Sequence, residues 1–390
     1  MNETGSNSGH SVQPRMTHPV SIVVPTFHEA ANIPAVADRV HAALAETGVE
    51  WELLFIDDAS DDGSETVVED LARRLPVRMK VRRNMPRDLS LAVLEGIRLS
   101  RFDRIVVMDA DLSHPPERIL DLLVALDTGC DMAVGSRYMP GGSVDRNWGL
   151  WRLLNSHIAT LLARPLVSCS DPMSGFFAID RRWLPDRKAL RPIGYKIALE
   201  LMVRGQPRVT EVPIAFHDRH LGDSKMNWKQ QFNYLRHLRR LYQHKFGNPV
   251  RLLLFGCVGA SGFIIDTAGY LGLQQLGTEH RLARGLSFWP AVTWNWWLNR
   301  KMTFSDRKPL PQGRQWAKFV VASLVGFAVN WGCYTVLTTF SDVFAQRRML
   351  AFICGIGLGS IVNFLIANRY VYHADLAPVE DVSPSAMERS

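Results

Sequence analysis

The sequence predicts an α/β domain with a mostly parallel sheet, then amphipathic helices, then an all-α membrane domain of four helices. In the first part of the 390-residue chain, short apolar runs rich in β-branched residues alternate with segments of helical periodicity. In the last part, three stretches approach the roughly 20 apolar residues that cross a bilayer. Between these parts lies a basic segment with interleaved aromatic residues.

These patterns divide the chain into five regions. They are a disordered N-terminus (1–18), the α/β domain (19–224), amphipathic interfacial helices (225–250), the membrane domain (251–373) and a disordered tail (374–390).

Five strands and the helices between them justify the α/β assignment. The strands are expected at 20–27, 51–56, 77–83, 104–108 and 131–136, and the helices at 32–46, 64–74, 89–100 and 115–126. Proline is tolerated at a helix start, so Pro115 and Pro116 can open the last helix. No GxGxxG follows the first strand, which argues against a dinucleotide-binding dehydrogenase.

Three of these strands end in acidic or polar residues, at 26–29, 57–58 and 109–111. The carboxyl ends of parallel strands meet at one edge of the sheet, so these residues should line one cleft. Carboxylate oxygens suit Mg²⁺ or Mn²⁺, which bridge to substrate phosphates. We therefore predict a nucleotide-diphosphate site with Asp109 and Asp111 as metal ligands; acidic turns and helix caps are the alternative.

Charge and cysteine content narrow the function classes. The net charge of +7 suits a membrane surface, and no nucleic-acid-binding motif is present, so we expect no nucleic-acid partner. The five cysteines lack CxxC spacing and are expected to be buried free thiols. The polar N-terminal segment lacks an apolar core, so we expect no cleavable signal peptide and a cytoplasmic first domain.

Five ordered motifs between 20 and 226 resemble the inverting GT-A glycosyltransferases of family 2. The motifs are VSIVVPTFHEA, FIDDASDDGS, MDADLSHPPE, GSRYMPGG and DPMSGFFAI. Within that family the sequence is most similar to the polyprenyl-phosphate (dolichol-phosphate) mannosyltransferases and glucosyltransferases. It departs from them at Ser113, where many members have Gln, and at 87–90, where a Gly-rich helix start is usual.

The resemblance implies roles on the donor side. Asp109 and Asp111 would face the diphosphate, with Asp111 the more direct metal ligand. Asp58 would hydrogen-bond the base. The residues that would contact the nucleotide are Pro25, Thr26, Glu29 and Asp58.

It also implies an acceptor side. The planar fork of Arg137 suits a phosphate, and Arg152 and Ser156, four residues apart on a helix, would hold the lipid phosphate. An ordinary amphipathic helix is the alternative for that pair. Asp171 and Ser174 belong to a motif that resembles the sugar-facing loop of the family.

A second loop resembles a mobile loop of the family that closes on the donor diphosphate. It has the pattern R-x-x-G-x-S-K, and its matching residues include Arg219, Ser224 and Lys225. The two basic side chains would supply positive charge where the leaving group becomes negative. We expect no catalytic base, because a phosphate monoester is largely dianionic at neutral pH and can attack directly. The histidines at 114, 217 and 220 are interpreted as loop residues.

The segment 225–251 contains seven Lys or Arg residues and no acid, interleaved with aromatic and leucine residues. This pattern predicts a basic amphipathic helix on an anionic membrane surface. A helix that binds nucleic acid or a protein partner is the alternative.

Four membrane spans are expected, at about 252–274, 283–299, 319–341 and 349–368. The second is short and contains Pro290, but an internal repeat supports it. Five positions of the first span match positions 64 residues later. Phe255, Gly262, Phe263, Asp266 and Tyr270 correspond to Phe319, Gly326, Phe327, Asn330 and Tyr334. Asn-Arg at 299–300 recurs at 368–369. The segment resembles the four-helix GtrA-like membrane domain.

Charge also predicts orientation. The loop 300–318 carries six basic residues and one acid, which places it and both termini in the cytoplasm of a multi-pass cell-membrane protein. Asp266 is costly inside a span and should face the bundle, either as a structural group or on a path for lipid or sugar.

We therefore predict the inverting transfer of a hexose from a nucleotide sugar to polyprenyl or dolichyl phosphate at the cytoplasmic membrane face. GDP-mannose is the favoured donor, because the context of DPMSGFF and GDSKM is most similar to the mannose members. UDP-glucose and UDP-N-acetylhexosamine are the nearest alternatives. From another class, the chain could be a non-catalytic membrane scaffold or a lipid-sugar translocation protein. The sequence leaves the oligomeric state open, a homo-oligomer included.

Overall fold

The computed structural model describes residues 18–144, 150–186, 190, 193–194, 196–216, 228–307 and 310–372. The chain forms two compact units, Met1–Leu241 and Tyr242–Ser390. The division falls inside the segment that the sequence assigns to interfacial helices. Of the ends for which we predict disorder, 1–18 and 374–390, all residues but His18 lie outside the described residues.

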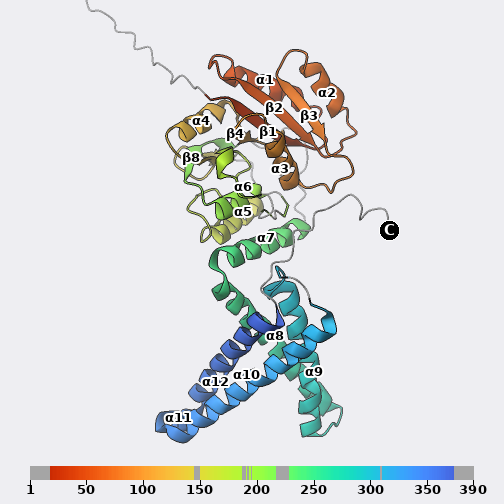
Figure 1. Cartoon of the computed structure of the whole chain (residues 1–390), viewed down its shortest axis with the longest axis vertical. Helices are drawn as coiled ribbons and strands as arrows, with labels where there is room; N and C mark the ends of the chain where they lie inside the picture. The colour runs from red at the N-terminus through yellow and green to blue at the C-terminus, as the bar shows by residue number, and fades with distance from the viewer. Residues whose placement is uncertain are drawn as a thin grey trace, which may run out of the picture. The chain divides into compact units, whose positions relative to one another are not determined.

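A seven-stranded sheet is the centre of the first unit (Figure 1). Its strand order is β3-β2-β1-β4-β7-β5-β8, and only β7 runs antiparallel to its neighbours. The strands are β1 (Val20–Thr26), β2 (Trp51–Asp57), β3 (Val77–Val81), β4 (Arg104–Val107), β5 (Met132–Ser136), β7 (Phe177–Asp180) and β8 (Val209–Pro213). The five predicted strands are confirmed, whereas β7 and β8 were not predicted.

Helices cover both faces of this sheet, because alternate strand residues point to opposite faces. Leu53 and Phe55 belong to a core that includes α1, α2 and α4, while Leu54 and Ile56 belong to a second core with α3 and α6. The helices of this unit are α1 (Ile33–Leu44), α2 (Ser64–Leu71), α3 (Leu89–Leu99), α4 (Ile119–Asp127), α5 (Leu150–Ala163), α6 (Ile197–Gly205) and most of α7 (Trp228–Phe246), whose last residues belong to the second unit. Short 3₁₀ turns, η1 (Pro116–Arg118) and η2 (Arg181–Trp183), precede α4 and follow β7, and a small parallel pair joins β6 (Ser143–Val144) to β9 (Ala215–Phe216).

Helix α7 has two faces of different character. On one face, the Tyr234 hydroxyl donates to the Ala159 carbonyl at 2.7 Å, and His237 Nδ1 accepts from the Ile193 amide at 3.2 Å. On the other face, the side chains of Trp228 and Phe232 are 88% and 61% exposed. The helix is therefore amphipathic, as predicted, and much of the apolar surface of Trp228 and Phe232 is exposed.

Four long helices build the second unit: α8 (Asn248–Gln275), α9 (His280–Leu298), α10 (Gln312–Phe340) and α12 (Arg348–Ile366). A short helix α11 (Asp342–Gln346) joins the last two. Among the described residues, three helices are long and apolar enough to cross a membrane: Asn248–Gln275, Gln312–Phe340 and Arg348–Val371. Helix α9, the expected second span, is not among them, because polar and basic residues interrupt its apolar sequence.

The predicted internal repeat is visible in this unit. Each repeat ends in a π-helical turn, η4 (Asn299–Thr303) and η5 (Ala367–Val371), which start 68 residues apart. The rings of Phe304 and Tyr372, which follow these turns, stack with centroids 4.3 Å apart. Each repeat thus contributes one ring to a buried aromatic stack.

The cysteine prediction needs a correction. All five cysteines are free, as predicted, but only Cys169 is buried, and Cys257 and Cys354 are exposed. The last two lie on α8 and α12, and apolar residues of a membrane helix can face outward, where lipid takes the place of a protein core.

Candidate active site

A polar pocket of about 300 Å³ lies at the carboxyl ends of β1, β2 and β4. Its walls include all six residues assigned from sequence to the nucleotide and metal: Pro25, Thr26, Glu29, Asp58, Asp109 and Asp111. The three strands are parallel neighbours, so their ends bring together residues more than 80 positions apart. The predicted meeting of these side chains at one edge of the sheet is confirmed.

Asp58 is held by two neighbours that the sequence did not connect to it. Its side chain pairs with Arg82, which is also buried, and its Oδ2 accepts from the Asp88 amide at 3.1 Å. Burial, only partly offset by Arg82, raises the pKa of the Asp58 carboxyl. Arg82 directly follows β3, the strand next to the one that Asp58 follows. A basic residue at the end of a neighbouring strand is therefore the sequence signal by which the Asp58–Arg82 pair could have been predicted.

Ser113, which stands at the family's usual glutamine position, orients a predicted metal ligand. Asp111 is buried, and its Oδ1 accepts from the Ser113 hydroxyl at 2.6 Å and from the Ser113 amide at 3.1 Å. The serine therefore fixes the carboxylate of Asp111.

His114 is buried beside Asp109, the other predicted metal ligand, and binds its backbone. Its Nδ1 accepts from the Asp109 amide at 3.1 Å, and its ring stacks on Phe176 with centroids 5.4 Å apart. Burial lowers the pKa of the His114 imidazole, which keeps it neutral and able to accept this hydrogen bond. The interpretation of His114 as a loop residue without chemistry is thus replaced by a positioning role, since it is buried beside Asp109.

The residues at this edge fit a divalent cation. The Asp109 carboxylate is one-third exposed, and a Cβ built on Gly175 would lie 3.3 Å from Asp109 Oδ2, so a larger residue there would crowd the carboxylate. Among the described residues, no group of three or more His, Cys, Asp or Glu side chains is arranged to hold a metal ion without other ligands. Two carboxylates suffice for Mg²⁺ or Mn²⁺, whose other ligands are commonly phosphates and water.

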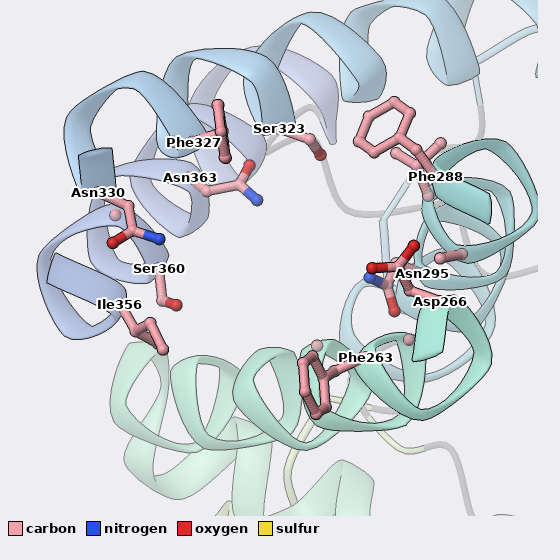
Figure 2. Close-up of a pocket in the computed structure, with 16 residues that line it drawn as sticks. Phe263, Asp266, Phe288, Asn295, Ser323, Phe327, Asn330, Ile356, Ser360 and Asn363 are labelled. Carbon is pink, nitrogen blue, oxygen red and sulfur yellow. The ribbon is translucent and has the colours of Figure 1, made fainter. Parts of the chain in front are cut away.

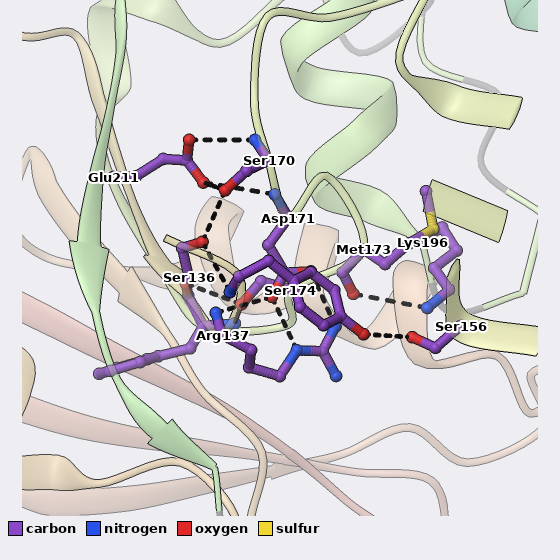
Figure 3. Close-up of polar contacts among 11 residues, drawn as sticks. Ser136, Arg137, Ser156, Ser170, Asp171, Met173, Ser174, Lys196 and Glu211 are labelled. Carbon is purple, nitrogen blue, oxygen red and sulfur yellow. Dashed lines mark hydrogen bonds and ion pairs between the residues drawn. The ribbon is translucent and has the colours of Figure 1, made fainter. Parts of the chain in front are cut away.

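Arg137 and Asp171 form the centre of a second cluster (Figure 3). The guanidinium donates to Asp171 through Nε at 2.7 Å and Nη2 at 2.8 Å, a bidentate pairing. The rings of Phe216 and Tyr138 lie 5.1 and 5.3 Å from the guanidinium carbon. Asp171, assigned from sequence to a sugar-facing loop, is fully buried and acts here as the partner that orients Arg137.

The loop that carries Asp171 is held by Glu211 of β8. The Ser170 amide donates to Glu211 at 3.0 Å, and the Asp171 amide lies 3.3 Å from the same carboxylate. Ser174 is buried, and its amide donates to the Asp171 carbonyl at 3.2 Å. These contacts make Ser174 a residue of the loop's internal structure.

Ser156 joins this cluster from α5. Its hydroxyl lies 2.8 Å from the hydroxyl of Tyr138, the residue after Arg137 (Figure 3). Arg152 belongs to the same helix, but its side chain lies outside the described residues. The loop residues Arg219, Ser224 and Lys225 lie outside them as well, as do the histidines at 217 and 220.

Lys196 is a basic residue of the site that sequence reasoning missed. It precedes α6, and its Nζ donates to the Met173 carbonyl at 3.4 Å (Figure 3). Burial and the charge of Arg137 lower the pKa of this ammonium to about 7, against the opposing charges of Asp171 and Asp109. Lys196 thus interacts by charge with Arg137 and Asp171 of the second cluster and with Asp109 of the nucleotide pocket. No motif marked Lys196, because its neighbours are distant in sequence.

Comparison with known proteins agrees with this architecture. Residues 21–187 match the family Glycosyl transferase family 2, and residues 254–372 match the GtrA/DPMS, transmembrane domain. The dolichol-phosphate mannosyltransferase of Pyrococcus furiosus is 34% identical over 350 residues, which cover 88% of this chain and 97% of that protein.

Two further relatives match over shorter spans. The dolichol-phosphate mannosyltransferase of Saccharomyces cerevisiae is 40% identical over 60% of this chain and 91% of its own length. The polyprenol monophosphomannose synthase of Mycolicibacterium smegmatis is 38% identical over 55% of this chain and 83% of its own length. The GT-A fold and the membrane location expected from sequence are confirmed. The chain belongs to glycosyl transferase family 2, as a membrane-bound glycosyltransferase with a GtrA/DPMS transmembrane domain.

Proposed function

We propose that this protein transfers mannose from GDP-mannose to a polyprenyl phosphate with inversion, at the cytoplasmic face of the membrane. The observation that carries the proposal is the nucleotide pocket with Asp109 and Asp111, linked by charge to the cluster of Arg137 and Lys196. The names of the relatives, dolichol-phosphate mannosyltransferase and polyprenol monophosphomannose synthase, support both substrates.

On the donor side, Asp111 and Asp109 would hold Mg²⁺ or Mn²⁺. When bound, such a cation would supply positive charge for the leaving diphosphate. Ser113 orients the Asp111 carboxylate, and His114 holds the backbone of Asp109 through its amide. Pro25, Thr26, Glu29 and Asp58 would contact the nucleoside, and Arg219 and Lys225, with Ser224 between them, would close over the diphosphate.

On the acceptor side, Arg137, Ser156 and Arg152 would bind the lipid phosphate, and Lys196 would add positive charge beside it. A phosphate monoester has its second pKa near 6, so it is mostly dianionic at pH 7 and needs no general base. The site then has to align the phosphate oxygen with the anomeric carbon on the face opposite the nucleoside diphosphate. Attack from that face inverts the anomeric configuration.

The experiment that tests the proposal is a donor panel. Full-length protein in detergent, with Mn²⁺ or Mg²⁺ and polyprenyl phosphate, is mixed with radiolabelled GDP-mannose, UDP-glucose or UDP-N-acetylglucosamine. Label entering the organic phase is counted. We expect transfer from GDP-mannose and a loss of about 100-fold or more in Asp111→Ala.

The matched control is Asp121→Ala, which removes an exposed carboxylate of α4 that pairs with Arg118 at 2.7 Å. This variant should keep wild-type transfer. Transfer from a UDP-sugar instead would replace mannose with glucose or N-acetylhexosamine. No transfer from any donor would favour the scaffold or translocation alternative, whereas full transfer in Asp111→Ala would contradict the assignment of Asp111 as a metal ligand.

A further inference from the structure

The membrane unit contains an open pocket of about 320 Å³, partly lined by polar side chains, that the transferase reaction does not use (Figure 2). It is lined by residues of α8, α9, α10 and α12. Figure 2 shows Asn330, Ser360 and Asn363 across the open space from Asp266 and Asn295. Polar side chains are costly within a bilayer, and where they gather they usually have a function.

The lining follows the internal repeat without exception. Every lining residue of α8 has a counterpart on α10 that also lines the pocket, 64 residues later. Every lining residue of α9 has a lining counterpart on α12, 68 residues later. The pairs that matter most are Gly262 with Gly326, Asp266 with Asn330, and Asn295 with Asn363. The pocket therefore lies between the two repeats, which contribute equivalent positions.

Glycines make room for the asparagines in both repeats. A Cβ built on Gly262 would lie 2.2 Å from Asn295 Oδ1, and one built on Gly326 would lie 2.8 Å from Asn363 Cβ. Each amide thus packs on a glycine of the neighbouring helix. The Oδ1 atoms of Asn295 and Asn363 are buried and have no hydrogen-bond partner among the described residues. A buried acceptor without a partner is costly, so a donor supplied by a ligand would be favourable.

The charges of the pocket select the kind of ligand. Its lining includes one carboxylate, Asp266, and no Lys or Arg. That carboxylate already accepts from Arg284, which is not a lining residue, and from the Ser287 hydroxyl at 2.7 Å. A phosphate would meet a carboxylate and amide oxygens without a lining cation, which disfavours it. Hydroxyl groups donate and accept, and so do amides, so a neutral polyol fits this lining.

We propose that this pocket binds the neutral, hydroxyl-rich ring of a lipid head group, about the size of one sugar, while the phosphodiester that joins the ring to the lipid stays outside the lining. The volume lies at the small end of the range for ligand pockets, which suits a single ring. Two lipids could present such a ring: the mannosylated product and an inositol phospholipid. The choice of the mannosylated product as the ligand rests on the proposed function. The proposal that the pocket binds a polyol ring does not depend on that function.

The test is photocrosslinking on the full-length protein in lipid nanodiscs. The probe is a polyprenyl phosphate mannoside with a diazirine on the sugar, added with excess unlabelled polyprenyl phosphate to occupy the catalytic acceptor site. Adducts are mapped by peptide mass spectrometry. We expect them within 259–295 and 323–363, and we expect competition by unlabelled product.

Two variants test the pocket, one by removing its amide groups and one by filling its volume. Asn295→Leu combined with Asn363→Leu keeps side-chain shape but removes both amides, and should reduce labelling about tenfold. Ser360→Phe keeps the amides and fills the volume, and should also reduce labelling. Thr335→Val, an exposed position of α10 outside the lining, is the control and should label as wild type does. All variants should keep transferase activity with a short-chain acceptor, which shows that the catalytic unit folds, and should keep the wild-type unfolding midpoint and elution volume in detergent, which report on the membrane unit.

The outcomes separate the two proposals. Competition by phosphatidylinositol but not by product keeps the polyol pocket and overturns its assignment to the product. Adducts confined to the catalytic unit, or wild-type labelling in both pocket variants, overturn the pocket itself. A failed donor panel with labelling still competed by phosphatidylinositol would overturn the proposed function alone.

Discussion

At the scale of single residues, Arg137 and Lys196 show how a buried site keeps positive charge. Asp171 binds the guanidinium of Arg137 in a bidentate pair, so this cation is compensated and fixed. Lys196 instead interacts through a weak hydrogen bond to a carbonyl and through charge, and its pKa falls to about 7. The two cations therefore respond differently to pH.

We predict that Lys196 sets the alkaline limb of activity. Its pKa is lowered to about 7, so its positive charge is present below that pH and is lost above it. The kcat/KM for the acceptor should rise near about pH 6, as the phosphate ionises, and fall as Lys196 deprotonates. In Lys196→Arg the guanidinium stays charged, so the fall should move to higher pH. The measurement is kcat/KM against pH for both proteins.

Removing the positive charge of Lys196 should lower the activity and its dependence on pH. Lys196→Met should lower kcat/KM at pH 6 by about tenfold to hundredfold and should flatten the alkaline limb. The control Lys80→Met removes an exposed ammonium of β3 and should leave the profile unchanged. An unaltered alkaline limb in Lys196→Arg would assign the fall to another group.

At the scale of elements, the start of α3 replaces the glycine-rich turn common in the family with a capped helix. Asp88 has an extended conformation, and its side chain accepts from the Leu91 amide at 3.1 Å, which is an N-cap. It also accepts from the Gly194 amide at 3.1 Å, and its own amide donates to Asp58. One residue thus ties the helix to the nucleotide pocket and to the segment that leads to Lys196.

We predict that Asp88→Ala destabilises the catalytic unit. The loss of a cap and of a second buried hydrogen bond should cost about 1–2 kcal/mol. For a domain of this size that corresponds to a fall of about 3–6 °C in the unfolding midpoint. Scanning fluorimetry in detergent measures it. Asp70→Ala, which removes an exposed carboxylate of α2, should change the midpoint little, and equal midpoints for both variants would contradict the capping argument.

At the scale of the whole molecule, α9 decides the topology. Its 19 residues have a length of about 28 Å, close to the 30 Å of a bilayer core, but its composition is too polar for it to qualify alone. The internal repeat pairs it with α12, which does qualify. If α9 crosses the membrane, the chain has four spans and both termini lie on the same side. If α9 does not cross, the chain has three spans and the termini lie on opposite sides.

We predict four crossings with both termini in the cytoplasm. Fusions of green fluorescent protein and of alkaline phosphatase to each terminus report the side, because the first is fluorescent in the cytoplasm and the second is active outside it. Both ends should fluoresce, and neither should show phosphatase activity. A phosphatase-active C-terminus with a fluorescent N-terminus would mean three crossings. The basic loop 300–318 is the reason for the expected orientation.

The sequence by itself determined whatever depends on local patterns. Alternating periodicities placed five strands, and the acidic residues after three of them had to meet, because parallel strands end at one edge of a sheet. Apolar length and the repeated residues placed the membrane helices and their pairing. Motifs of the family then supplied roles for these positions.

Only the tertiary structure decided the contacts between distant segments. The antiparallel insertion of β7 between β4 and β5, the pairing of Arg137 with Asp171, and the approach of Lys196 depend on chain crossings that no local period encodes. The membrane pocket is similar: each repeat supplies half of its lining residues, and the two halves meet only when the helix pairs pack. Periodicity reports which face of an element is buried, whereas packing alone decides which residues that face meets.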